Sequence, residues 1–131
     1  MATCRREFLT QTAERMAGHG VGAVSRSDLV DAAFGRVLFE WADGARFVHL
    51  FEDGVRACTS VFVEVDYLSV RDVEPMPLVE VMRRTGKPDA PSTIRLHAED
   101  QVLELVVPMR LYTFLCPALS AVAGATKRFD G

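Results

Sequence analysis

The stretch RVLFEWADGARFVHLFEDGVRACTSVFVEV, residues 36–65, carries the strongest structural signal in the chain. It contains two Asp-Gly pairs, Asp43-Gly44 and Asp53-Gly54, which separate three runs rich in apolar residues. Asp-Gly accepts the positive φ angles of the tight turns that join antiparallel strands. The stretch therefore predicts a meander of three antiparallel strands.

Turns centred on the Asp-Gly pairs predict which residues face each other across the strands. Phe39 is expected to pair with Val48, and Leu50 with Ala57. One face of the sheet then collects apolar side chains and is expected to form the core. Its members are Val37, Phe39, Trp41, Val48, Leu50, Ala57, Val61 and Val63.

The opposite face mixes charged residues with large apolar ones, whereas a solvated face of an antiparallel sheet usually shows cleaner polar alternation. This mixture indicates that something covers the face. The cover is either another part of the same chain or a subunit or partner, since sizeable exposed apolar patches mark interaction sites. Four residues are the predicted partner-binding anchors: Phe47, Phe51, Phe62 and Leu38.

Two helices are predicted before the meander from apolar residues at helical spacing. The first runs from Thr3 to Ala17, with Thr3 as its cap. Its apolar stripe contains Phe8, Leu9, Thr12, Ala13 and Met16. The second is a short helix over Ser25–Phe34, which ends at Gly35.

Two more helices follow the meander. The middle one covers Leu78–Gly86: prolines 75 and 77 precede it, and arginines 83 and 84 suit its last turn. Its expected buried stripe is Leu78, Val79, Met82 and Thr85. The last helix is expected to start between Thr113 and Pro117 and to bury Leu115, Leu119, Val122, Thr126 and Phe129.

Residues 94–107 predict a separate hairpin with Glu99-Asp100 as its loop. This register places Leu96 opposite Leu103 and Arg95 opposite Glu104. Apolar pairs and pairs of opposite charge both stabilise neighbouring strands. Runs of antiparallel strands segregated from the helices indicate an α+β fold. We expect a single domain over residues 1–131, with one antiparallel sheet of about five strands packed against N-terminal, middle and C-terminal helices.

Composition excludes several classes of protein. The net charge of −3 over 131 residues argues against nucleic acid as a partner, because phosphate binding relies on a basic face. Three cysteines (Cys4, Cys58 and Cys116) without paired spacing favour a reducing compartment over a disulfide scaffold. No apolar run approaches the roughly 18 residues that span a bilayer. The sequence therefore predicts a cytoplasmic protein with no membrane association.

One juxtaposition could carry chemistry, because the predicted register places His49 opposite Cys58. Such a pair could be a nucleophile and its base, or half of a zinc site. Both residues lie within strands, however, whereas catalytic groups favour loops. The acidic residues Glu64, Asp66, Asp72 and Glu74 do not have the spacing of a calcium loop. With no nucleophile elbow or dinucleotide fingerprint, we expect no catalytic residue, metal or cofactor.

The stretch TIRLHAEDQVLELVVP, residues 93–108, together with the order of the predicted elements, resembles the YbjN-like and type III secretion chaperone-like family. In that family a middle helix precedes a hairpin that ends in an apolar-Pro step, and a closing helix follows. The likeness covers roughly residues 36–130. It implies a small homodimeric or accessory protein that binds other proteins and has no catalytic residues.

These observations favour a non-enzymatic protein-binding module, a chaperone or adaptor, that holds a partner through an apolar surface. A second hypothesis is an immunity or antitoxin protein whose acids Glu64, Asp66 and Asp72 cap a basic enzyme cleft. A third is a small-ligand-binding protein or an enzyme that uses His49 and Cys58.

Overall fold

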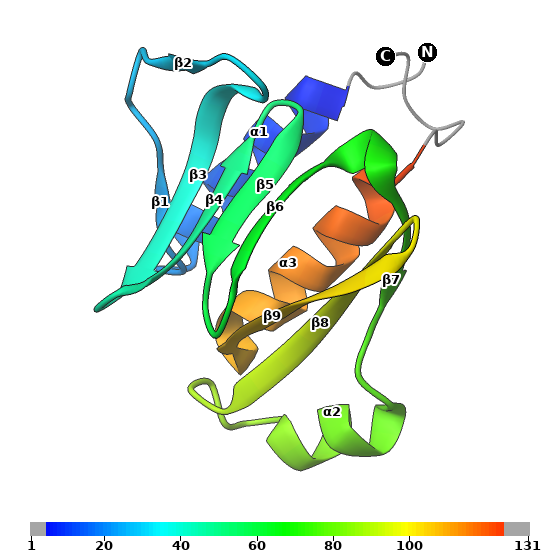
Figure 1. The fold of residues 1–131 in the computed structure, drawn as a ribbon. Helices are drawn as coiled ribbons and strands as arrows, with labels where there is room; N and C mark the ends of the chain where they lie inside the picture. The colour runs from blue at the N-terminus through cyan, green and yellow to red at the C-terminus, as the bar shows by residue number, and fades with distance from the viewer. Residues whose placement is uncertain (1–4, 125–131) are drawn as a thin grey trace.

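A computed structural model of the protein describes residues 5–124. In chain order, the elements within this range are α1 (Arg5–Gly18), β1 (Ala23–Val24), β2 (Val30–Asp31), β3 (Gly35–Asp43), β4 (Arg46–Phe51), β5 (Gly54–Cys58), β6 (Phe62–Asp66), the 3-10 helix η1 (Tyr67–Ser69), β7 (Val70–Glu74), α2 (Leu78–Arg84), β8 (Pro91–Ala98), β9 (Gln101–Pro108) and α3 (Met109–Val122) (Figure 1).

The strands form antiparallel sheets packed with helices, which confirms the α+β class. The meander and the hairpin, expected in one sheet, lie in two separate sheets. The larger sheet has the order β1-β3-β4-β5-β6, with β2 also paired to β3, and the smaller sheet has the order β7-β8-β9. There are more strands than expected, in part because the short strands β1 and β2 pair with β3. Two further changes add to the number. A turn between Cys58 and Phe62 divides the predicted third strand of the meander into β5 and β6. Residues 70–74 form a strand that pairs with β8.

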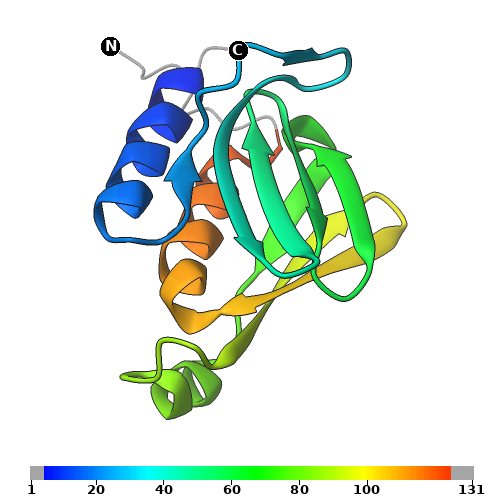
Figure 2. The same ribbon diagram turned by 90° about the vertical axis from the view of Figure 1, so that its left-hand side faces the viewer.

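The helices join the two sheets around a shared core. Helix α1 packs on β1 and β3, α3 packs on β7, β8 and β9, and the two helices contact each other (Figure 2). The stripe predicted for α1 is confirmed, because Leu9, Thr12, Ala13 and Met16 are buried, while Thr3 lies outside the described residues. A single cluster of buried side chains extends from this stripe through the larger sheet to the smaller one.

The predicted register of the meander is wrong, but its faces are right. Phe39 pairs with Leu50 and Trp41 with Val48, so the first turn is centred one residue later than predicted. Val48 pairs with Ala57, so the second turn is centred one residue earlier. Each change moves the pairing by two residues, and a strand repeats its side-chain direction every two residues. The expected core face is therefore buried, except for half-buried Val37 and for Val61 in the turn, which is 56% exposed.

The helix predicted over Ser25–Phe34 is not formed. The segment contains the short strand β2 and irregular backbone. The carboxylate of Asp31 accepts hydrogen bonds from the backbone N–H groups of Ala33 (2.9 Å) and Phe34 (3.0 Å). Such local side-chain bonds offer the backbone an alternative to helical pairing.

The hairpin of residues 94–107 has the predicted register, with Leu96 opposite Leu103 and Arg95 opposite Glu104.

Helix α3 starts at Met109, earlier than expected. The carbonyls of Ala90 and Pro88 accept the first N–H groups of the helix, those of Met109 (2.9 Å) and Arg110 (3.0 Å). These contacts replace a side-chain cap. Leu115, Leu119 and Val122 are buried as predicted, while Thr126 and Phe129 lie outside the described residues.

Candidate functional site

Phe51, one of the predicted anchors, is buried by the chain itself and is not available to a partner in this structure. It is only 6% exposed, with the ring of Phe34 centred 5.7 Å away. The guanidinium of Arg56 lies over both rings. A side chain at Gly54 would collide with Phe34, because a Cβ there would lie 2.6 Å from the ring. The segment that was predicted to be a helix is therefore the cover of this end of the sheet.

The other three predicted anchors differ in exposure. Phe47 is half-buried, with its ring 4.8 Å from that of His49. Leu38 is half-buried against the core. Phe62 is 58% exposed on β6, at the end of the larger sheet. Of the four, Phe62 alone presents most of its side chain to solvent.

The predicted His49–Cys58 pair is wrong in register. His49 faces Arg56, and Cys58 faces Phe47 on one side and Phe62 on the other. Burial lowers the pKa of His49, an effect that the nearby Glu40 carboxylate partly opposes. Arg56, the actual neighbour of His49, forms ion pairs with Glu64 (2.6 Å) and Asp31 (2.9 Å). Within residues 5–124, no group of three or more His, Cys, Asp or Glu side chains could hold a metal ion.

Two of the three acids proposed for an immunity function lie close together. Glu64 and Asp66 line a hollow of about 380 Å³ between β6 and the β8–β9 turn, where Glu99 and Asp100 join them. Glu64 is paired with Arg56, and Asp66 accepts a hydrogen bond from the Ser69 hydroxyl at 2.6 Å. Asp72 lies on β7 in the smaller sheet and does not line this hollow.

Three exposed apolar side chains lie on one helix where the sequence predicted a buried surface. Leu78, Val79 and Met82 of α2 are 73%, 54% and 66% exposed. Thr85 is also exposed, and α2 has no buried residue. The predicted buried stripe of this helix is therefore wrong. Figure 1 shows the reason: α2 projects from the body of the protein at the end of an extended connection, away from both sheets.

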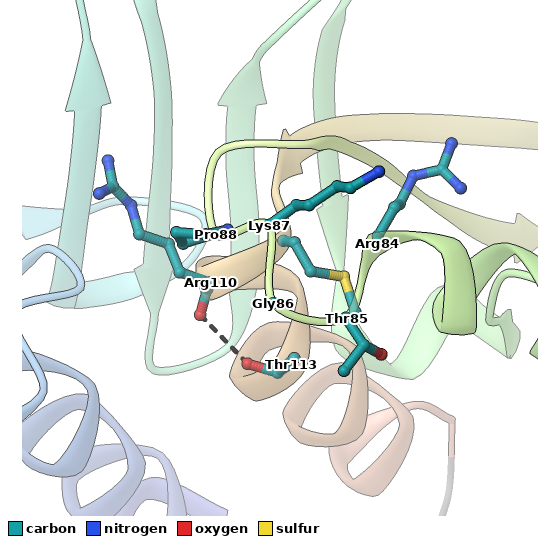
Figure 3. Close-up of a pocket in the computed structure, with 8 residues that line it drawn as sticks. Arg84, Thr85, Gly86, Lys87, Pro88, Arg110 and Thr113 are labelled. Carbon is teal, nitrogen blue, oxygen red and sulfur yellow. Dashed lines mark hydrogen bonds between the residues drawn. The ribbon is translucent and has the colours of Figure 1, made fainter.

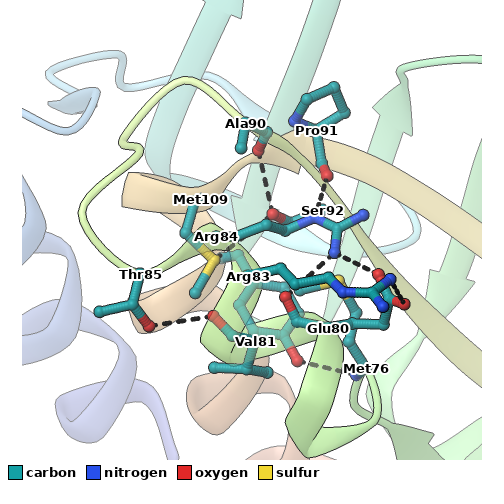
Figure 4. Close-up of polar contacts among 11 residues, drawn as sticks. Met76, Glu80, Val81, Arg83, Arg84, Thr85, Ala90, Pro91, Ser92 and Met109 are labelled. Carbon is teal, nitrogen blue, oxygen red and sulfur yellow. Dashed lines mark hydrogen bonds and ion pairs between the residues drawn. The ribbon is translucent and has the colours of Figure 1, made fainter.

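We call residues 75–90, which contain α2 and the loop after it, the α2 arm. Hydrogen bonds attach it to the body, among them those that the carbonyls of Ala90 and Pro88 accept from the start of α3. The hydroxyl of Tyr112 accepts the N–H of Met76 at 2.9 Å. Arg84 donates to the carbonyl of Pro91 at 2.7 Å, and within the arm it also donates to the Glu80 carboxylate at 2.6 Å (Figure 4). The hydrogen bond from Arg84 holds the pKa of Glu80 below its ordinary value. The arm is thus positioned by hydrogen bonds and by the partial packing of Met76, Val81 and Ala90 against the core, while Leu78, Val79 and Met82 remain in solvent.

Beside the arm lies a hollow of about 280 Å³ (Figure 3). Its floor is apolar and its rim is cationic. The lining residues are Arg84, Thr85, Gly86, Lys87, Pro88, Met109, Arg110 and Thr113. Gly86 has φ +82°, a left-handed conformation suited to the residue after a helix, and this lets the chain turn back along the start of α3.

Comparisons of the chain with protein families, curated proteins and solved structures found no match. None of the helices in residues 5–124 combines the length and the hydropathy that crossing a bilayer requires.

Proposed function

We propose that the protein is a non-enzymatic protein-binding module, a chaperone or adaptor, and that α2 is its docking element. A single observation carries this proposal: three large apolar side chains, Leu78, Val79 and Met82, share one short helix that buries none of its residues. A second copy of the chain is one occupant that the resemblance to homodimeric chaperone-like proteins suggests. A different protein is the other.

Energetics support a partner at this surface. Removing a large aliphatic side chain from water contributes about 1.5–3 kcal/mol. Three such side chains on one face therefore offer a partner a compact anchor, and interface energy is typically concentrated in a few residues of this kind. The polar contacts that position the arm lower the ordering cost of binding. Phe62, on a different part of the surface, is a secondary anchor within the same proposal.

The test replaces Met82 with glutamate, which places a charge in the centre of the exposed face. The matched control is Leu68→Glu in η1, the short helix between β6 and β7, where the leucine is 60% exposed. The expected result is loss of self-association in sedimentation velocity, or loss of partners recovered from the protein's own cells, in Met82→Glu alone. The proposal would be overturned if the natural protein is monomeric and if the natural protein, Met82→Glu and Leu68→Glu all recover the same partners.

A second candidate is the immunity or antitoxin function, and the acidic hollow of Glu64, Asp66, Glu99 and Asp100 favours it. Such a partner would present a basic surface, and its affinity would fall steeply with salt. Partner binding that is insensitive to Met82→Glu but is abolished by Asp66→Asn and by moderate salt would support this function in place of the first.

A further inference from the structure

A second hollow extends the one beside the α2 arm along the exposed side of α3. It has a volume of about 420 Å³ and lies between α1 and α3. Its lining residues are Phe8, Arg15, Thr113, Phe114, Pro117, Ala118 and Ala121. Thr113 lines both hollows, so they adjoin along α3, and we call the two together the α3 groove. From Arg110 to Ala121 the groove is about 17 Å long, given the rise of a helix.

The two ends of the α3 groove differ because α1 and α3 run in opposite directions. His19, just after α1, contacts the ring of Phe114 near the start of α3. Arg5, at the start of α1, lies over Tyr67, whose carbonyl accepts the N–H of Gly124 just after α3. Arg15, near the end of α1, therefore lies at the end of the groove that is close to the start of α3, together with the cations of the first hollow. The opposite end is lined by Pro117, Ala118 and Ala121.

The charge of the groove contrasts with that of the protein. Four cationic side chains line it (Arg15, Arg84, Lys87 and Arg110), and no acidic residue does, although Arg84 is paired with Glu80 outside the lining. The whole chain has a net charge of −3. Lys87 and Arg15 are exposed and form no ion pair with any residue in the described range 5–124, and Arg110 has only a 3.4 Å contact with the well-exposed Asp89. Positive charge is thus concentrated at one end of a largely apolar groove.

We infer that the α3 groove receives an amphipathic helical segment of a partner protein, with an acidic end on Arg15, Lys87 and Arg110 and an apolar stripe along α3. Charge complementarity identifies the acidic end of the occupant. The apolar floor and a length of about three helical turns match a helix laid in a groove. This inference rests on the proposed binding function and specifies the chemistry of the partner.

The groove adjoins the docking element of the proposed function, since Arg84 both ends α2 and lines the first hollow. A partner anchored on Leu78, Val79 and Met82 would have its next segment at the cationic end of the groove. Figure 3 shows Arg110 on one side of the hollow, Lys87 and Arg84 on the other and Thr113 below. A carboxylate at the mouth of the hollow would therefore have guanidinium or ammonium groups on both sides.

The test uses a labelled synthetic peptide of about 14 residues, with glutamates in its first turn and leucines at helical spacing after them. The matched peptide has glutamine in place of each glutamate. Fluorescence polarisation measures the binding of each to the full chain. We expect saturable binding of the acidic peptide, weakened about tenfold by Lys87→Glu and by Arg15→Glu, because a like charge then faces the glutamates.

Arg71→Glu is the control for net charge, because Arg71 is exposed on β7 and forms no ion pair with the described residues. It should leave the affinity of the acidic peptide nearly unchanged. Equal binding of the two peptides, equal weakening by Arg71→Glu, or no saturable binding would overturn the inference. Met82→Glu tests α2 separately. If the peptide test fails while Met82→Glu still abolishes association, the inference about the groove is wrong and the proposed function stands.

Discussion

Helices α1 and α2 have the same kind of apolar periodicity and opposite environments. In α1, Leu9, Ala13 and Met16 are at most 1% exposed. In α2, Leu78 and Met82 occupy a comparable stripe and are 73% and 66% exposed. The first helix lies against the larger sheet, and the second projects from the body on an arm.

The difference shows what an amphipathic pattern specifies. Helical spacing of apolar residues predicts that a face will avoid water, but it does not state which surface will cover it. For α1, strands β1 and β3 of the same chain provide the cover. For α2, prolines 75 and 77 on one side and 88 and 91 on the other favour extended backbone, which carries the helix away from the core.

The largest expected effect is a difference in the free energy of unfolding when a leucine is truncated in the apolar stripe of α1 and in that of α2. Leu9→Ala should lower the free energy of unfolding by about 2–5 kcal/mol, because it leaves a cavity in a packed core. Leu78→Ala, the same change on α2, should alter it by no more than about 0.5 kcal/mol, because the side chain already lies in solvent. Urea denaturation followed by circular dichroism measures both. A loss of stability in Leu78→Ala as large as that in Leu9→Ala would contradict the exposure of α2.

The fold was most predictable where side-chain pairing and turn chemistry agree. In the hairpin of residues 94–107, Glu99-Asp100 is the loop and both apolar and charged pairs coincide in one register, which the structure confirms. In the meander, the Asp-Gly pairs were placed at the turn centres. The turns instead use Gly44-Ala45 and Glu52-Asp53, with Gly44 in the left-handed region. Composition cannot distinguish registers that differ by two residues, because both place the same side chains on the same face.

The candidate site was less predictable than the fold. Phe51 was expected to be an anchor because it shares a face with Phe47, and only the path of residues 25–34 reveals its burial under Phe34. Conversely, the apolar residues of α2 were recognised but were assigned to the core. The four prolines around the helix were the one signal of an arm. The α3 groove depends on contacts between α1, α3 and the loop of the arm, and no local pattern encodes these.

An intermediate effect is expected from the contact that attaches the arm. Tyr112→Phe removes the acceptor of the Met76 N–H at the cost of about 1 kcal/mol, which corresponds to roughly fivefold faster opening of the arm. Hydrogen exchange of the α2 amides should accelerate by that factor while the amides of α1 are unaffected. Tyr67→Phe is the matched control, because its hydroxyl donates to the Phe51 carbonyl in the core. That variant should lower global stability without a selective effect on α2.

The smallest effect is a dependence of the arm on pH. The pKa of Glu80 lies below its ordinary value of 4.5 because Arg84 donates a hydrogen bond to its carboxylate. A carboxyl group with a depressed pKa stabilises the folded arm above 4.5, and this contribution is lost as the pH falls through the lower, folded-state value. Protection factors of the α2 amides, corrected for the intrinsic exchange rate, should therefore decline below pH 4.5.

Glu80→Gln isolates the group responsible, because it removes the charge and retains an acceptor for Arg84. In this variant α2 should be less protected at neutral pH, and the decline in acid should disappear. If the natural protein and Glu80→Gln lose protection in parallel, the Glu80–Arg84 contact does not hold the arm. The hydroxyl of Tyr112 and the carbonyls of Pro88, Ala90 and Pro91 would then be the main attachments of the arm. The arm would in that case differ from α1 in what covers it and would have no pH dependence of its own.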